Sequence, residues 1–167
     1  TPLIEAISAE KDAIVCDLIG SGADVNMAAR DGRTPLIIAA QIGYGKPMLE
    51  AIVKAGAFLE HRDQYGNTAL LCAAMRSNPE AIRYLLDAGC NPHVVNDIGD
   101  NACILASQAN FAVGWALETL QMLVKAGVNV NHRNVKRESA LDAARKSDIV
   151  DKERVVALLE RLQKKQI

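Results

Sequence analysis

The sequence has few aromatic residues and no long apolar run. Only 4% of its 167 residues are aromatic, although 50% are hydrophobic. Alanine and small aliphatic residues dominate this apolar half, which favours closely packed helices over a sandwich of two sheets. No apolar run approaches the roughly 18 residues that a membrane-spanning helix needs. We therefore expect no membrane partner.

Neither sign of charge dominates the chain. The sequence has 19 Lys and Arg residues against 20 Asp and Glu, a formal net charge of −1. This balance gives no bulk attraction to nucleic acid, so we predict no nucleic-acid partner. The distribution is uneven, because residues 133–167 carry ten basic and six acidic side chains. We interpret this basic end as a solvated cap; binding of an acidic partner is the alternative.

The residues of familiar metal and catalytic sites are missing or wrongly spaced. The four cysteines show neither CxxC pairing nor the density of a disulfide scaffold, and they read as small buried side chains in a reducing, cytoplasmic compartment. His61 and His132 hold the same offset within their segments and are interpreted as neutral, solvent-facing residues. There is no GxxxxGK[ST], GxSxG or HExxH motif. We predict a protein without enzymatic activity, cofactor or metal.

What the sequence does contain is one block repeated five times. Thr34 can cap a helix through its hydroxyl, and Pro35 suits the first helical position. A second apolar run ends at Gly56, which suits a helix stop. Openings recur at positions 1, 34, 68, 101 and 139, and glycine stops at 22, 56, 89 and 127. A fixed period of this length predicts stacked units that bury their apolar faces against one another.

These features resemble the ankyrin repeat family, which has a 33-residue period and a Thr-Pro-Leu-His signature. The matching segments are Thr-Pro-Leu at 1–3 and 34–36, paired alanines at 39–40 and 73–74, and Gly-Ala-Asp-Val-Asn at 22–26. The resemblance implies an all-α solenoid of about five helix-turn-helix repeats joined by β-hairpin-like loops. We predict one domain, 1–167, with repeats near 1–33, 34–67, 68–100, 101–138 and 139–167, the last a C-terminal cap.

Several positions depart from the family pattern. Arg137 replaces the glycine of the last tip, which leaves the shape of that turn open. The fourth unit has five extra residues near Asn110–Trp115, and we expect its aromatic residues to pack onto the stack. An exposed Trp115 that anchors a partner is the alternative. Apolar packing is expected where four repeats lack the family histidine: Ile4, Ile37, Leu71 and Ile104, with Asp142 in the fifth.

The resemblance also implies which positions bind partners, namely the hairpin tips and the exposed side of each first helix, which together form a concave face. Tyr65, Ile98 and Met75 would be an apolar centre rimmed by charge, as in interface hot spots. The alternative is that they are scattered apolar surface residues, which are common. The predicted partner-binding residues are Arg30, Asp31, Arg33, Gln41, Ile42, Gln64, Tyr65, Asn67, Met75, Arg76, Asp97, Ile98, Asp100 and Trp115.

We therefore predict a non-enzymatic, monomeric module that binds another protein through this concave face. One alternative is a regulatory segment trimmed from a larger enzyme, channel or effector protein, because the chain begins inside a repeat at Thr1. Another is that the chain is a substrate for modification. The run Asp24-Val25-Asn26 resembles the pattern hydroxylated on asparagine in many ankyrin domains, which would place the modification on Asn26.

Overall fold

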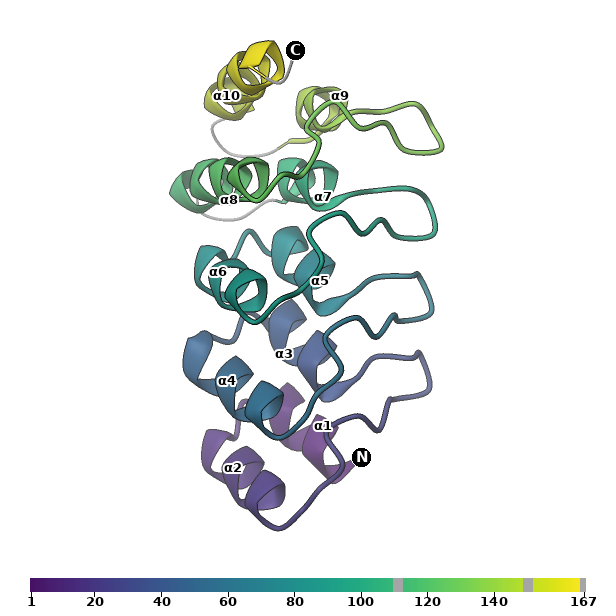
Figure 1. Cartoon of the computed structure of the whole chain (residues 1–167), viewed down its shortest axis with the longest axis vertical. Helices are drawn as coiled ribbons and strands as arrows, with labels where there is room; N and C mark the ends of the chain where they lie inside the picture. The colour runs from purple at the N-terminus through teal and green to yellow at the C-terminus, as the bar shows by residue number, and fades with distance from the viewer. Residues whose placement is uncertain (110–112, 149–151, 166–167) are drawn as a thin grey trace.

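The computed structural model describes residues 1–109, 113–148 and 152–165. Within them the chain forms ten helices, which pair in chain order and stack along the long axis with the two termini at opposite ends (Figure 1). The inner helices are α1 (Pro2–Ser8), α3 (Pro35–Ile42), α5 (Ala69–Met75), α7 (Ala102–Gln108) and α9 (Ala140–Lys146). The outer helices are α2 (Asp12–Gly20), α4 (Lys46–Lys54), α6 (Pro79–Asp87), α8 (Val113–Lys125) and α10 (Lys152–Lys165). Loops between successive pairs project beside the inner helices (Figure 1).

Each inner helix begins at the polar residue that the sequence predicted. The side-chain oxygens of Thr1, Thr34, Thr68, Asn101 and Ser139 each accept the backbone N–H three residues further on. This satisfies one of the backbone donors left free in the first helical turn. At α9 the cap is reciprocal, because Asp142 also accepts the backbone N–H of Ser139 at 3.0 Å. The repeated openings are therefore helix starts.

The core follows the stack from end to end. Paired alanines of the inner helices, at positions 39–40 and 73–74, are fully buried, so neighbouring helices approach closely. Outer helices contribute larger buried side chains such as Leu49, Ile52 and Leu85. Four repeats have an apolar residue where the family has histidine, and all four of these residues are buried: Ile4, Ile37, Leu71 and Ile104. Apolar packing therefore replaces a polar contact there, as predicted.

Each loop between successive helix pairs ends in a tight hairpin-like tip, and we call the four tips (29–33, 63–67, 96–100 and 134–138) the tip row. In each, the N–H of the first residue donates to the carbonyl of the fifth, over 2.9–3.1 Å. The fourth residue has a positive φ: +79° at Gly32, +75° at Gly66, +77° at Gly99 and +61° at Arg137. Arg137 thus keeps the turn that glycine makes elsewhere, although the left-handed region costs an L-residue about 1–2 kcal/mol.

The insertion in the fourth repeat lengthens an outer helix. Helix α8 has 13 residues, whereas α4 and α6 have 9 each. Trp115 lies in the first turn of α8, and 52% of the Trp115 surface is exposed. The expectation that this side chain packs onto the stack is therefore wrong. Phe111 and the other residues of the predicted insertion at 110–112 lie outside the described residues.

Candidate functional site

The tips are held at a fixed spacing by backbone hydrogen bonds from one to the next. Gln64 N–H donates to the Asp31 carbonyl at 2.9 Å, and Asp97 N–H donates to the Tyr65 carbonyl at 3.0 Å. Val135 N–H continues the series to the Ile98 carbonyl at 3.1 Å. Side chains at the tips therefore stand in a row whose geometry the backbone sets.

Buried side chains add a second link between tips and correct part of the predicted site. Asn96 Nδ2 donates to Asn67 Oδ1 at 3.2 Å, and Asn134 Nδ2 donates to Asp100 Oδ1 at 2.7 Å. These bonds bury Asn67 to 7% and Asp100 to 3% exposure. Asp100 was predicted on the exposed side of the tip, but the structure buries it and its carboxylate faces the next tip instead of solvent.

The two equivalent histidines are also structural. His61 Nε2 lies 2.9 Å from the Gly32 carbonyl, and His132 Nε2 lies 2.7 Å from the Gly99 carbonyl. Each ring is partly buried and bridges its own tip to the preceding one, so the prediction that they face solvent is wrong. Their identical offset was the signal, because a bridge between neighbours requires the same register in each repeat.

A hollow of about 300 Å³ lies between the first two tips and helices α3 and α5, and we call it the tip hollow. It gathers seven of the predicted binding residues from these two tips and two helices. Two lining residues, Asp63 and Cys72, were not among the predicted binding residues, and the cysteines had been interpreted as small buried side chains. The full lining is Asp31, Arg33, Gln41, Asp63, Gln64, Tyr65, Asn67, Cys72 and Met75.

The arginine in the tip hollow is held by its neighbours. Arg33 Nε donates to Asp31 Oδ2 at 2.7 Å, Nη2 lies 2.6 Å from the same oxygen, and Nη1 donates to Gln41 Oε1 at 2.6 Å. The hydrogen bond from Arg33 holds the pKa of the Asp31 carboxyl below its usual value. Arg76 Nε donates to the Gln41 backbone carbonyl, so this second predicted arginine secures the end of α3. Charge-assisted bonds of this kind fix side-chain orientation.

The floor of the tip hollow is a small, unreactive thiol. Cys72 is 2% exposed and holds the fourth position of α5, where α3 has Ile38 and α7 has Leu105. Burial raises the pKa of Cys72 to about 12, and the nearby Asp63 carboxylate contributes to the rise. Because nucleophilic cysteines need an accessible thiolate, Cys72 shapes this site without supplying a reactive group.

Exposed apolar residues continue from the tip hollow along the tip row. Exposure is 64% at Tyr65, 39% at Met75, 47% at Ile98 and 69% at Val135, and we call these four residues the apolar strip. Val135 belongs to the fourth tip, where Arg137 stands in place of the family's glycine.

The remaining predicted residues lie beside or away from the apolar strip. Arg30 is exposed at the first tip, and Asp97 is exposed at the third, where it forms an ion pair with Arg62 at 3.8 Å. Ile42 is partly buried and packs against the core. Trp115 lies in the first turn of α8 in the outer layer, so the structure does not bring it to the tip row.

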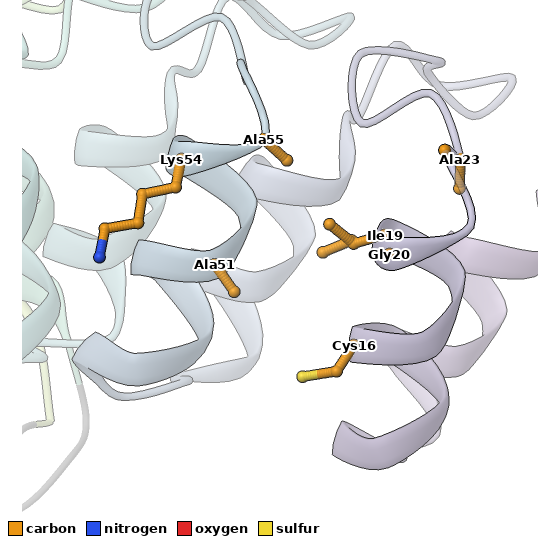
Figure 2. A pocket seen from close by; sticks show the side chains of 8 residues that line it. Cys16, Ile19, Gly20, Ala23, Ala51, Lys54 and Ala55 are labelled. Carbon is orange, nitrogen blue, oxygen red and sulfur yellow. The ribbon is translucent and has the colours of Figure 1, made fainter.

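A larger hollow of about 630 Å³ lies on the outer side, between α2 and α4 (Figure 2). Small residues line most of it, including Gly20, Ala51 and Ala55, and the exposed Cys16 lies at its edge. Its one charged residue, Lys54, pairs with Glu50 at 2.6 Å on the same helix. No polar groups converge on the space, so we interpret it as thin packing between two outer helices.

Asn26, the candidate for modification, links the first two repeats. Its Oδ1 accepts the Phe58 N–H at 2.7 Å, and its Nδ2 donates to the Gly56 carbonyl at 2.9 Å. Glu60 occupies the equivalent position in the next repeat and accepts the Asn91 N–H at 2.8 Å. The side chain therefore has a structural role, and its hydroxylation stays a prediction.

Among the residues with described coordinates, no helix is both long and apolar enough to cross a bilayer, and no group of His, Cys, Asp or Glu could hold a metal ion. Helix pairs stacked in one direction, with hairpin tips along one side, define a solenoid repeat protein. A family model described as ankyrin repeats, three copies, matches residues 3–96, more than half of the chain. The chain belongs to the ankyrin repeat family.

The relatives are ankyrin regions of much longer proteins. The chain is 30% identical over 151 residues to potassium channel AKT2/3 of Arabidopsis thaliana, covering 89% of this chain and 18% of the channel. It is 35% identical over 107 residues to neurogenic locus notch homolog protein 1 of Homo sapiens, covering 64% of this chain and 4% of that protein. It is 28% identical over 137 residues to ankyrin repeat domain-containing protein SAT10 of Stachybotrys chartarum, covering 78% and 6%.

Proposed function

We propose that this chain is a non-enzymatic module that binds another protein through the tip row and the exposed side of the inner helices. The observation that carries the proposal is the apolar strip, whose four members are between 39% and 69% exposed along one side of the stack. Clustered apolar side chains with charged neighbours are the usual composition of interface hot spots. Backbone bonds already hold the tips in register, so binding loses little conformational entropy.

Paired substitutions can test this surface without disturbing the core. We would replace Tyr65 and Ile98 by serine and compare the variant with Phe58→Ser, which removes an aromatic side chain of the same 64% exposure outside the tip row. Each protein would be immobilised and used for affinity capture from native cell extract, with circular dichroism as the check on folding. A protein captured by wild type and Phe58→Ser but lost by the double variant is the expected result.

Capture that is equal for all three proteins would refute the assignment and direct attention to Trp115 or to the basic C-terminal end. The predicted binding residues that remain on the proposed surface are those that line the tip hollow or are exposed at the tips, and the buried Asp100 is not among them. Their contribution would be ranked in the same assay by single substitutions at Arg30, Gln64 and Met75.

A regulatory segment of a longer protein is the second candidate function. The length of the relatives supports this candidate. This chain spans only 4–18% of the channel, notch and SAT10 proteins. In that case the partner of the apolar strip belongs to the same polypeptide. The remainder of the full reading frame, expressed as a separate protein, should then bind this chain, and Tyr65→Ser and Ile98→Ser should weaken that binding.

We further propose that 1–167 acts as one monomeric domain in a reducing compartment such as the cytoplasm. All four cysteines are free thiols, three of them buried, which supports this compartment. The inner and outer helices form continuous layers, which supports a single unit. Light scattering after size exclusion would measure the mass, and a dimer would overturn this part of the proposal.

A further inference from the structure

The second tip carries a negative charge that its turn does not need. Asp63 occupies the position that Asn96 and Asn134 occupy in the next two tips, and all three use Oδ1 to accept the N–H groups two and four residues further on. The distances are 2.9 and 2.8 Å for Asp63, 3.2 and 2.8 Å for Asn96, and 2.9 and 3.0 Å for Asn134. A neutral amide oxygen therefore makes the same turn, so the charge of Asp63 needs another explanation.

This charge is not balanced within the tip hollow. The lining has two carboxylates, Asp31 and Asp63, but one cation, Arg33. Arg33 directs Nε and Nη2 to Asp31 and Nη1 to Gln41, each within 2.7 Å. Asp63 Oδ2 accepts Asn67 Nδ2 at 3.3 Å, which leaves acceptor capacity on a carboxylate oxygen. One negative charge is thus in excess at the wall of the hollow.

The shape of the hollow suits one long side chain. Its volume of about 300 Å³ corresponds to about ten water molecules at their liquid density. Cys72, which lines it, is smaller than Ile38 and Leu105, which hold the same position in α3 and α7. Tyr65 and Met75 supply an aromatic ring and a thioether chain at its walls.

We propose that the tip hollow is the subsite for one arginine or lysine side chain of the protein partner. Its methylene chain lies against Met75 and Cys72, and its cation lies between the Asp63 carboxylate and the ring of Tyr65. Long basic side chains bury their stems on apolar surface while the head stays polar, and cations are attracted to aromatic faces. An acidic side chain does not suit this hollow, because it would face the two carboxylates of Asp31 and Asp63, and the single cation of Arg33 is already paired with Asp31.

This inference rests on the proposed function, and one experiment tests both separately. Random linear peptides displayed on phage would be selected against the wild-type chain, and affinities of the enriched peptides measured by fluorescence anisotropy. We expect arginine or lysine at one fixed position. Replacing it by citrulline or norleucine, which keep the stem but lose the charge, should weaken binding about tenfold, equivalent to about 1.4 kcal/mol.

Asp63→Asn is the decisive variant, because Asn96 and Asn134 show that asparagine keeps the turn. It should bind the basic peptide about tenfold more weakly than wild type does and bind the neutral peptide as wild type does. Circular dichroism should show an intact fold, with a melting temperature lowered at most by the loss of the one bond from Asn67 to Asp63. Cys72→Leu, which fills the floor, should weaken the basic peptide as well. Comparing arginine with lysine in the same peptide decides which cation the hollow prefers.

The failures of the two proposals look different. An acidic or apolar residue at the fixed position, or equal binding to wild type and Asp63→Asn, would overturn the cationic subsite. If Ile98→Ser still abolishes binding in that case, the proposed function stands. No enriched peptide, or binding that neither Ile98→Ser nor Asp63→Asn changes, would overturn both.

Discussion

Replacing Arg137 by glycine should stabilise this protein, because Arg137 makes a turn that glycine makes in the other tips. Its φ is +61°, against +75° to +79° at Gly32, Gly66 and Gly99. Relief of the left-handed conformation gains about 1–2 kcal/mol. The greater freedom of glycine in the unfolded chain costs about 0.5–1 kcal/mol. The net gain should be about 0.5–1 kcal/mol, or about 1–4 °C in melting temperature for a chain of this length.

The reverse change at the same position of the preceding tip should destabilise. A Cβ on Gly99 would lie 3.3 Å from the Asn134 Cα and from the Val135 backbone nitrogen, in addition to adopting a φ of +77°. Gly99→Ala should therefore cost at least about 1–2 kcal/mol. If Arg137→Gly raises the free energy of unfolding and Gly99→Ala lowers it, the left-handed conformation at this position of the turn determines the change in stability.

Thermal and urea-induced unfolding followed by circular dichroism would measure both changes. Arg137→Ala is the matched control, because it removes the charged side chain but keeps the Cβ, and its stability should stay within about 0.5 kcal/mol of wild type. If Arg137→Gly is no more stable than Arg137→Ala, the gain does not come from backbone conformation and the reasoning fails.

Three further predictions concern caps and thiols. Asn101→Ala should cost roughly twice the about 1 kcal/mol of Thr68→Ala in urea unfolding, since the Asn101 amide also donates to the Asn129 carbonyl at 2.8 Å; equal losses would contradict this. Burial raises the pKa of Cys72, Cys90 and Cys103 to about 12, so maleimide should label only Cys16 in the native protein, as measured by intact mass. For the same reason the free energy of unfolding should fall as pH rises above about 8.5, where these thiols ionise in the unfolded chain but not in the folded one. Asp142→Ala should cost about 1 kcal/mol at neutral pH. Hydrogen bonds from Ser139 lower the pKa of Asp142, so the stabilities of the two proteins should begin to converge as pH falls below about 4 and should meet below the lowered pKa.

Helix starts and stops could be predicted because their signals are local. Thr34 and Pro35 act on the first turn of their own helix, and Gly56 acts on the end of one helix. The residues that determine where a helix starts or ends therefore lie next to that helix in the sequence. The period then followed from repetition of these signals. The retained turn at Arg137 could not be predicted in the same way, because its stability depends on bonds to the neighbouring tip, such as Val135 N–H to the Ile98 carbonyl.

The site was harder to predict because its residues act across repeats. Asp100 looked exposed in a polar turn, but its carboxylate meets Asn134, 34 positions away. Cys72 looked like ordinary core, and its importance appears only beside Ile38 and Leu105 at the same position of other helices. Comparing equivalent positions between repeats, and asking which residue each would meet in the next repeat, would have found both.

The wide gap between α2 and α4 has a mechanical consequence. Each helix pair packs mainly against its neighbours, and the termini lie at opposite ends of the stack (Figure 1), so a pull on the two ends passes through every interface in series. We expect the stack to yield first at this interface, because the space of about 630 Å³ beside Cys16 leaves thin packing between its outer helices. Under load the chain would release α1 and α2 first, while the tip hollow, which rests on α3 and α5, would stay intact for longer.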